Sequence, residues 1–214
     1  ECSGCPNHCE IREVRTRGNK PLYYGSRCEK YNVDSPRVKK DSLPDLFEER
    51  DKFLLQGHGE KREGRPGIGI PRALIFYDIH PFWEAFFDSL GFETILSDRT
   101  SKNIVRAGLD SVVEETCFPV KVAHGHISNL LGKKVDYIFL PMIVNTGQKS
   151  PNMEQSFNCP YVQTLPFVSK SAFDFESSGT KLLNPVIAFG WGKGYASERL
   201  ITLGKELGSS KRLT

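Results

Sequence analysis

Beyond residue 65, short apolar runs alternate along the chain with longer amphipathic stretches. The apolar runs predict strands, which we expect at 66–71, 92–97, 135–144, 161–165 and 186–189. In the amphipathic stretches apolar residues recur at helical spacing, which predicts helices at 80–90, 101–109, 119–131 and 195–207. Strands that alternate with helices favour an α/β fold, here a three-layer architecture with a mainly parallel sheet.

Residues 1–64 form a different kind of segment. They are polar and rich in Gly, Pro and charge, with few large aliphatic side chains, and one short helix is expected around 43–55. Such a segment cannot be held together by apolar burial alone and needs docking or a bound metal. The sequence therefore predicts a small cysteine-rich metal- or cluster-binding segment, 1–64, and an α/β lobe, 65–214. Because it begins at Glu1 without an initiator Met, we expect a portion of a longer polypeptide.

Composition limits the function classes. The 214 residues carry a formal net charge of +3, with 38% hydrophobic and 26% charged residues, which is ordinary for a folded domain and too apolar for disorder. So balanced a charge gives no electrostatic argument for binding nucleic acid or a charged membrane surface. The longest apolar run, 135–144, spans about half a bilayer. With no visible leader, we expect no membrane segment and a cytoplasmic location.

The placement of cysteine is unusual. Four of the six cysteines fall in the first segment, where Cys2, Cys5 and Cys9 form C-x2-C-x3-C and Cys28 follows after eighteen residues. Thiolates are soft ligands, so four of them predict zinc or an iron–sulfur cluster, and the spacing alone does not choose between the two. Unliganded thiols or disulfides are a further alternative, as is a metal that merely folds a small knuckle.

Cys117 is a cysteine of another kind, because it stands two residues before Pro119, and proline favours the first turn of a helix. The free amides and the dipole at a helix N-terminus stabilise a thiolate or an anionic cluster. Lys121 and His124 follow on the same helix face, and we expect this face to line a cleft. The alternative is that Cys117 is a small buried hydrophobe and that Lys121 and His124 form a solvated edge.

Three further signals are weaker. Cys159 precedes the expected strand 161–165, so a parallel strand would place it at the sheet edge opposite Cys117 and an antiparallel one would bring the two together. A buried structural thiol is the alternative. Glu115 is a candidate acid or base, although carboxylates also stabilise helix starts. The glycine turn 190–194 lies between a strand and a helix, where a phosphate can meet amide groups, and an ordinary turn is the alternative.

Several uncommon sequence motifs occur in order along the chain. They are Cys-Ser-Gly-Cys-Pro-Asn-His-Cys-Glu (2–10), Gly-Ser-Arg-Cys-Glu-Lys (25–30), Ile-Gly-Ile-Pro-Arg (68–72), Pro-Phe-Trp-Glu-Ala-Phe-Phe (81–87) and Glu-Thr-Cys-Phe-Pro-Val-Lys-Val-Ala-His-Gly-His (115–126). With them the chain resembles an uncharacterised domain of large CoA-enzyme activase polypeptides. These are relatives of the activator of 2-hydroxyacyl-CoA (2-hydroxyglutaryl-CoA) dehydratase. The resemblance covers most of residues 1–170 and thins out after that.

The resemblance implies a redox setting. In that wider group, dehydratase subunits and double-cubane-cluster proteins hold iron–sulfur clusters between Rossmann-like lobes, and an activase with an actin/Hsp70-like ATPase fold delivers low-potential electrons, driven by ATP. By position, Cys117 matches the cysteine that heads the family motif, and Lys121, His124 and His126 match its following residues. Dehydratase subunits use three cysteines per cluster, of which we assign Cys117 and Cys159. No ATPase signature is visible in this chain.

We therefore expect an iron–sulfur redox module, with a 4Fe-4S cluster, that accepts or relays low-potential electrons. Its expected partners are an ATPase activase domain or subunit and a CoA-thioester dehydratase. If the chain is part of an enzyme, we expect a component of a 2-hydroxyacyl-CoA dehydratase/reductase-type system, with Glu115, Lys121 and His124 as catalytic side chains. The second expectation is a zinc-stabilised structural or docking module without catalysis of its own. The third is a CoA-thioester or nucleotide-binding enzyme that uses the turn 190–194.

Overall fold

The computed structural model describes residues 1–4, 7–18, 21–28, 31, 44–55, 64–147, 152 and 156–208 of the chain. The chain forms two compact units, Glu1–Asp51 and Lys52–Thr214. The sequence predicts a division into 1–64 and 65–214.

The first unit holds a two-stranded antiparallel hairpin. β1 (Arg12–Val14) pairs with β2 (Leu22–Tyr24). Gly25 follows the hairpin with φ +96°, and a Cβ at this position would lie 2.2 Å from the carbonyl oxygen of Glu10. Only glycine permits this approach, which holds the residues before β1 close to those after β2. Cysteines on either side of the hairpin are thereby brought toward each other.

Helix α1 (Leu46–Leu54) confirms the short helix expected around 43–55. It starts at Asp45, whose Oδ1 accepts hydrogen bonds from the backbone N–H groups of Phe47 (3.0 Å) and Glu48 (3.2 Å). No side chain of α1 is buried, so local capping rather than burial supports its start.

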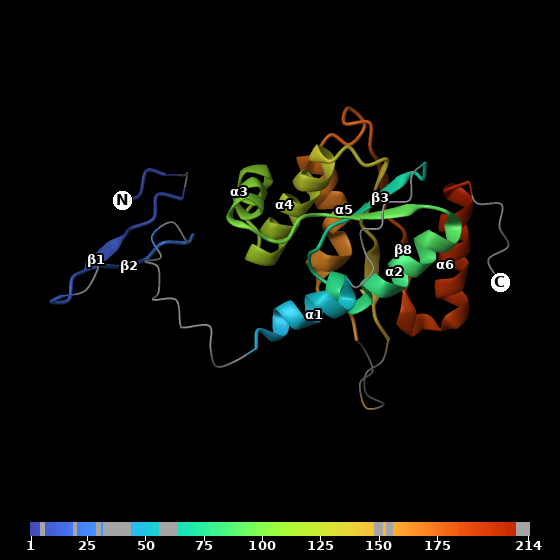
Figure 1. Ribbon diagram of the computed structural model, residues 1–214, viewed down its shortest axis with the longest axis horizontal. Helices are drawn as coiled ribbons and strands as arrows, with labels where there is room; N and C mark the ends of the chain where they lie inside the picture. The colour runs from blue at the N-terminus through green and yellow to red at the C-terminus, as the bar shows by residue number, and fades with distance from the viewer. Residues whose placement is uncertain are drawn as a thin grey trace. The chain divides into compact units, whose positions relative to one another are not determined.

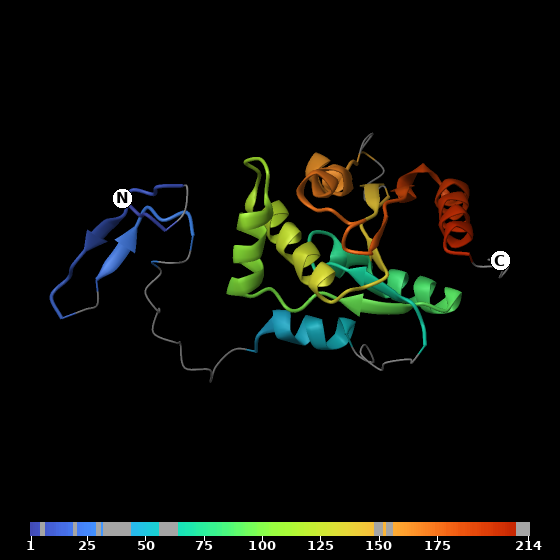
Figure 2. The same cartoon turned by 90° about the horizontal axis from the view of Figure 1, so that it is seen from above.

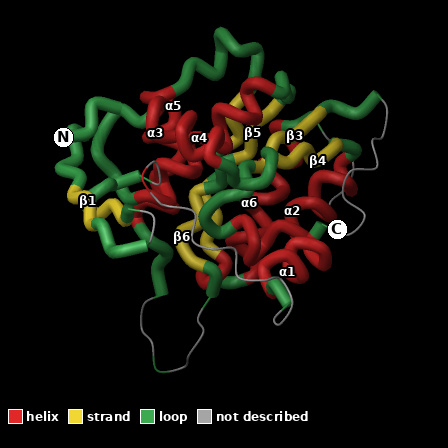
Figure 3. The backbone as a smooth tube through the Cα atoms, turned by 60° about the vertical axis from the view of Figure 1, so that its left-hand side comes forward, coloured by secondary structure: helices red, strands yellow, loops and turns green. Residues whose placement is uncertain are grey.

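The second unit is built on a four-stranded parallel sheet in the order β4-β3-β5-β7. Its strands are β3 (Gly67–Ile70), β4 (Glu93–Leu96), β5 (Tyr137–Phe139) and β7 (Lys181–Leu183). Figure 3 shows β5, β3 and β4 next to one another. A second sheet consists of the parallel pair β6 (Met142–Asn145) and β8 (Val186–Ala188). The strand order of the main sheet changes direction between β3 and β5.

Helices cover both faces of the sheet. They are α2 (Phe76–Leu90), α3 (Lys102–Ser111), α4 (Phe118–Gly132), α5 (Pro160–Ala172) and α6 (Lys193–Glu206), with a 3-10 turn, η2 (Phe189–Trp191), before α6. Residues of α2 and α6 share one apolar core with Phe139 of β5, and residues of α4 and α5 share another with Ile138. Adjacent residues of a strand point to opposite faces. The expected α/β fold with a mainly parallel sheet is therefore confirmed.

Two glycines let α3 and α4 touch, and the two helices lie side by side in Figures 1 and 2. A Cβ on Gly125 would stand 1.9 Å from the carbonyl oxygen of Ile104, and one on Gly108 would stand 2.0 Å from that of Lys121. No side chain fits at either position. This contact holds the first half of α4, which Cys117 precedes.

The predicted strand 161–165 is wrong, because these residues belong to α5. Pro160 occupies the first turn of the helix, where its fixed φ and its missing N–H are tolerated. The buried residues of α5 are Leu165, Pro166 and Ser169, which is helical spacing. The strand that does follow is β7, which the sequence pattern did not predict.

The single strand predicted over 135–144 is also wrong, because it divides into β5 and β6. Pro141 stands between them and has no N–H to donate. On either side of it, the N–H of Leu140 donates to the carbonyl oxygen of Leu183 (2.9 Å) and that of Met142 to Pro185 (2.9 Å). Backbone pairing resumes beyond the proline as the separate β6–β8 sheet.

Helix length bears on the membrane question. The helices α2 and α4 have 15 residues each, and a crossing takes about 20 apolar residues. Among the residues described, no helix is long and apolar enough to span a membrane.

Candidate functional site

Cys2, one of the cysteines predicted to bind a metal, contacts Cys9 and Tyr31 in the first unit. The N–H of Cys2 donates to the carbonyl oxygen of Cys9 at 2.9 Å, and the Tyr31 hydroxyl donates to Cys2 Sγ at 3.3 Å. This hydrogen bond, followed by burial and by the charges of Cys2, Cys28 and Cys9, raises the pKa of Tyr31 above its ordinary value. Of these three sulfurs, that of Cys2 is the hydrogen-bond acceptor of the phenol hydroxyl.

Cys2 is the buried member of this group. Its side chain is 7% exposed, whereas those of Cys9 and Cys28 are partly exposed. Cys2 Sγ also accepts a hydrogen bond from the N–H of Gly4 at 3.4 Å. Two donors aimed at one sulfur suit a thiolate, since a thiol sulfur is a weak acceptor. The donor chemistry fits a soft metal or an iron–sulfur cluster.

The fourth predicted ligand, Cys5, lies outside the described residues. Within the ranges that the structure does describe, no three Cys, His, Asp or Glu side chains form a group that could hold a metal ion. The four-cysteine ligand set remains a prediction. Tyr31 was not among the predicted site residues, and its position three residues after Cys28 was its one sequence signal.

Cys117 is the N-cap residue of α4, with proline in the first turn, as predicted. Its side chain is exposed and makes no capping hydrogen bond. The alternative of a small buried hydrophobe is therefore wrong. The sulfur is presented to solvent at the positive end of a four-turn helix.

Lys121 is held next to this helix start by Glu115. Its Nζ lies 2.7 Å from Glu115 Oε1, and the lysine side chain is 14% exposed while the glutamate is 76% exposed. The alternative in which Lys121 forms part of a solvated edge is therefore wrong. The two charges form a pair in the segment that surrounds Cys117.

His124 is fully buried, so the expected face of α4 does not continue into an open cleft at this residue. Its Nδ1 lies 2.9 Å from the carbonyl oxygen of Val120, and its ring stacks on Phe173 at 5.9 Å between centroids. Because a carbonyl oxygen only accepts, Nδ1 carries the proton in this hydrogen bond. Among the residues that the structure describes, its Nε2 has no hydrogen-bond partner.

His126 is a buried connector at the carboxyl end of β4. Its Nδ1 and Nε2 lie 2.8 Å from Ser97 Oγ and 2.9 Å from Thr100 Oγ1, and Ser97 Oγ accepts from the N–H of Arg72 at 2.9 Å. Burial, and secondly the charge of Arg72, lowers the pKa of His126 to about 4, against an opposing effect of Asp98. The neutral imidazole ties α4 to the loops after β3 and β4. The sequence pattern gave no reason to select Ser97 or Thr100.

Cys159 is the N-cap residue of α5 and is exposed, so it is not a buried structural thiol. Its neighbour Asn158 donates from its N–H to the carbonyl oxygen of Val144 (2.8 Å) and from Nδ2 to that of Ile143 (3.0 Å). Cys159 therefore lies near the carboxyl end of β6.

The predicted position of Cys159, at the sheet edge opposite Cys117, is wrong. It assumed a parallel strand over 161–165, and these residues belong to α5. α4 leads into β5 and α5 leads into β7, and these strands are parallel. Helices that return the chain to parallel strands begin at the carboxyl side of the sheet. Cys117 and Cys159 thus occupy the same side of the fold, each at the start of a helix.

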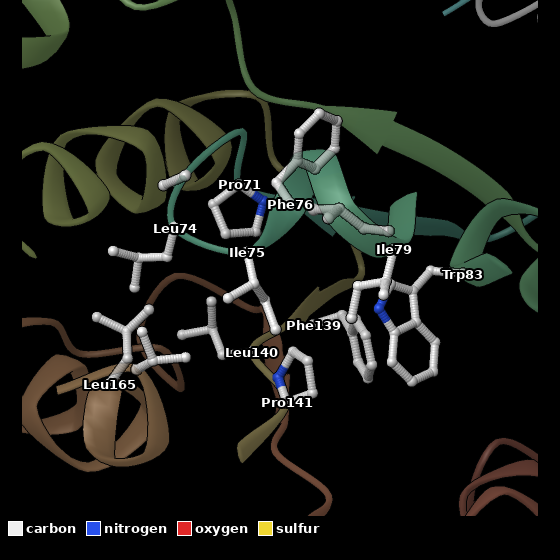
Figure 4. A pocket seen from close by; sticks show the side chains of 13 residues that line it. Pro71, Leu74, Ile75, Phe76, Ile79, Trp83, Phe139, Leu140, Pro141 and Leu165 are labelled. Carbon is white, nitrogen blue, oxygen red and sulfur yellow. The ribbon is translucent and has the colours of Figure 1, made fainter. Parts of the chain in front are cut away.

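An apolar pocket lies where the strand order changes direction, which is the usual ligand position in such sheets. Figure 4 shows Leu74 and Ile75, from the loop after β3, above Leu140 and Pro141, which follow β5. The cavity holds about 50 Å³, whereas ligand pockets measure about 300–1,000 Å³. It is therefore too small for a cofactor and offers no reactive side chain.

The glycine turn 190–194 joins η2 to α6. Asn145 Oδ1 accepts a hydrogen bond from the N–H of Gly190 at 2.6 Å, and a Cβ on Gly190 would lie 2.9 Å from the same oxygen. Gly192, with φ +96°, is the N-cap residue of α6. Packing and chain reversal account for both glycines without a phosphate.

A protein family described as CoA enzyme activase uncharacterised domain matches residues 67–214, more than two-thirds of the chain. The chain belongs to this family. The family resemblance noted in the sequence is thereby confirmed, but its extent differs, because the match runs on to residue 214 and does not include the residues before 67. The match to the CoA enzyme activase domain includes Cys117 and Cys159, and it begins after the hairpin and its cysteines. No curated protein and no solved structure matches the chain.

Proposed function

We propose that this CoA enzyme activase domain is an iron–sulfur redox module associated with the ATP-dependent activation of 2-hydroxyacyl-CoA dehydratase-type enzymes, in which it accepts or relays low-potential electrons. Family membership supports the activation setting. The observation that carries the redox part is the pair of contacts at Cys2, whose N–H donates to the carbonyl oxygen of Cys9 and whose Sγ accepts from the Tyr31 hydroxyl. Clustered thiolates select iron–sulfur clusters or zinc.

Cys2, Cys5, Cys9 and Cys28 are the proposed ligands. A 4Fe-4S cluster held by four thiolates would supply one-electron chemistry at low potential. The chain's own contribution is to hold the buried Cys2 sulfur with two hydrogen-bond donors. The close approach of Gly25 to Glu10 keeps the segments that carry Cys9 and Cys28 together. Donors next to sulfur reduce the electrostatic cost of gathering several thiolates.

Cys117 and Cys159 are the proposed cofactor-binding thiols of the α/β unit. Both are exposed and both precede a helix, whose positive N-terminal end favours an anionic cluster. The proposed catalytic side chains are Glu115, Lys121 and His124. The Glu115–Lys121 pair would hold a proton near Cys117, and His124 offers an acceptor at Nε2.

The proposed partners are an ATPase activase domain or subunit, which supplies electrons, and a CoA-thioester dehydratase, which receives them. The common position of two exposed thiols at the carboxyl side of the sheet supports this assignment. Groups that exchange electrons with another protein must come close to the surface of that protein. A buried thiol could not approach a partner in this way.

Metal analysis of protein purified without oxygen tests this function. We expect iron and sulfide in the full chain, and an EPR signal after reduction with dithionite. Cys28→Ser should lose most of the iron bound by the first unit, whereas Ser3→Ala, an exposed neighbour of Cys2 without a proposed role, should keep it. Zinc at all the sulfurs, with no reducible iron, would contradict the redox function.

A zinc-stabilised docking module is the second candidate, and the exposure of the hairpin favours it. Val14, Leu22 and Tyr24 are 44%, 41% and 56% exposed, so within the described part of this unit these side chains form no buried apolar core. A structural zinc would replace that core. This function predicts one tightly bound zinc per chain, no visible absorbance and no redox signal.

A further inference from the structure

Tyr31 makes a contact to Cys2 that local chain geometry does not impose. The two residues are 29 positions apart, and the phenol proton is directed at Cys2 Sγ over 3.3 Å. The second donor to this sulfur, the N–H of Gly4, is two residues away and belongs to a local turn. The Tyr31 contact therefore depends on how the segments after β2 and before β1 come together.

The Tyr31 ring is itself held in place by the hairpin. Tyr23 of β2 packs against it, with 5.7 Å between ring centroids and an interplanar angle of 50°. The next residue, Tyr24, points to the other face of the strand and is 56% exposed. Neighbouring tyrosines of one strand thus differ in role, since Tyr23 supports Tyr31 and Tyr24 does not.

The sulfur that accepts the hydrogen bond from Tyr31 belongs to the most buried of the described cysteines. A buried anionic group requires hydrogen bonds to replace lost water, and charge-assisted hydrogen bonds are the strong ones. Hydrogen bonds to ligand sulfur are among the factors that set the reduction potential of an iron–sulfur site. They withdraw electron density from the sulfur and favour the more negatively charged, reduced state.

We propose that Tyr31 is a positioning residue of the cysteine site, which donates a hydrogen bond to Cys2 Sγ and so lowers the electron density on this ligand. The inference rests on the proposed binding of a metal or cluster by these cysteines. It assigns Tyr31 an electronic effect on one ligand, not a part in holding the metal by itself. Removal of the hydroxyl should then change the properties of the bound group more than its amount.

Tyr31→Phe in the full chain tests this inference, with Tyr24→Phe as the matched control. Both variants lose one phenol oxygen from the first unit, and only Tyr31→Phe loses a donor to sulfur. After anaerobic purification, we expect wild-type iron content in both. At a fixed potential near the wild-type midpoint, the ratio of reduced to oxidised protein should fall about five- to tenfold in Tyr31→Phe. The control should match the wild type.

A second measurement keeps the test independent of the metal's identity. With zinc bound instead of iron, alkylation of Cys2 by iodoacetamide, followed by mass spectrometry, should be several-fold faster in Tyr31→Phe than in the control. Replacement of Tyr31 by 3-fluorotyrosine, a stronger donor that keeps the ring, should change both the potential and the alkylation rate in the opposite direction. This variant covers the case in which Tyr31→Phe does not fold.

The outcomes separate the two proposals. A wild-type chain that binds only zinc overturns the redox function, and the alkylation rates then decide the role of Tyr31. Bound iron or zinc with an unchanged potential and unchanged alkylation in both Tyr31 variants overturns the role of Tyr31 and leaves the function standing. A wild-type chain that binds neither metal overturns both.

Discussion

The hairpin unit and the α/β unit are stabilised by different means. Among the described apolar residues of the first unit only Cys2 is buried, whereas the second unit contains two apolar cores with fully buried residues such as Phe87 and Ile138. Burial of apolar area is the main favourable contribution to folding. The α/β unit therefore has its own source of stability. The described residues of the hairpin have no such core, and under the proposed function a bound group stabilises them.

Metal removal should separate the two units most strongly. A chelator under reducing conditions should unfold β1 and β2, because binding of a structural metal contributes about 10 kcal/mol or more in small sites of this kind. β3 and β5 should keep their structure. Hydrogen exchange read out by NMR compares the strands directly. Equal protection of the hairpin with and without metal would show that it needs no bound group.

Gly125→Val should have the next largest effect and act on the other unit. The new Cβ would stand 1.9 Å from the carbonyl oxygen of Ile104, so α3 and α4 must separate, at a cost of about 3 kcal/mol. Urea denaturation measures this loss, and the metal content of the hairpin should not change.

Gly132 provides the matched control for this substitution. It lies at the end of the same helix, and a Cβ there meets nothing within 4 Å. Gly132→Ala should therefore leave stability unchanged or raise it by less than about 1 kcal/mol. Equal losses for the two variants would mean that the close contact of α3 and α4 is not what Gly125 provides.

The pH dependence of stability should also belong to the α/β unit. The pKa of His126 is lowered to about 4 from 6.5, so the unfolded chain takes up a proton first as the pH falls. The stabilising contribution is complete above about pH 6.5 and should fall by about 2 kcal/mol between pH 7 and pH 5. His126→Gln should flatten this slope in urea denaturation at the two pH values. An unchanged slope would assign the dependence to other groups.

The sequence predicted those parts of the fold in which the pattern along one segment was sufficient. The helical spacing of α2 and α4 and the proline after Cys117 located these helices. The five residues 161–165 alternate between apolar and polar types in part, which imitates a strand. The helical spacing of Leu165, Pro166 and Ser169 extends beyond these five residues. A pattern of only five residues could therefore not indicate the helix.

The site was less predictable, because its contacts join distant segments. The sequence selected the cysteines from their spacing, but the Tyr31–Cys2 hydrogen bond spans 29 residues. His124 lies on the expected helix face, yet its burial depends on Phe173, which closes over it from the end of α5. Pairings of this kind arise only when separate elements pack, and no local pattern encodes them.

Pro141 has a consequence for the proposed binding of a partner protein. Since β3 ends level with Phe139, β6 carries the chain past the end of the main sheet. α4 contacts the residues after β4 with its second half, through His126, Asn129 and Lys133. Its first turns therefore extend in the same direction. Under the proposed function, a partner could then reach both exposed helix-start cysteines from one side of the unit, without entering the fold.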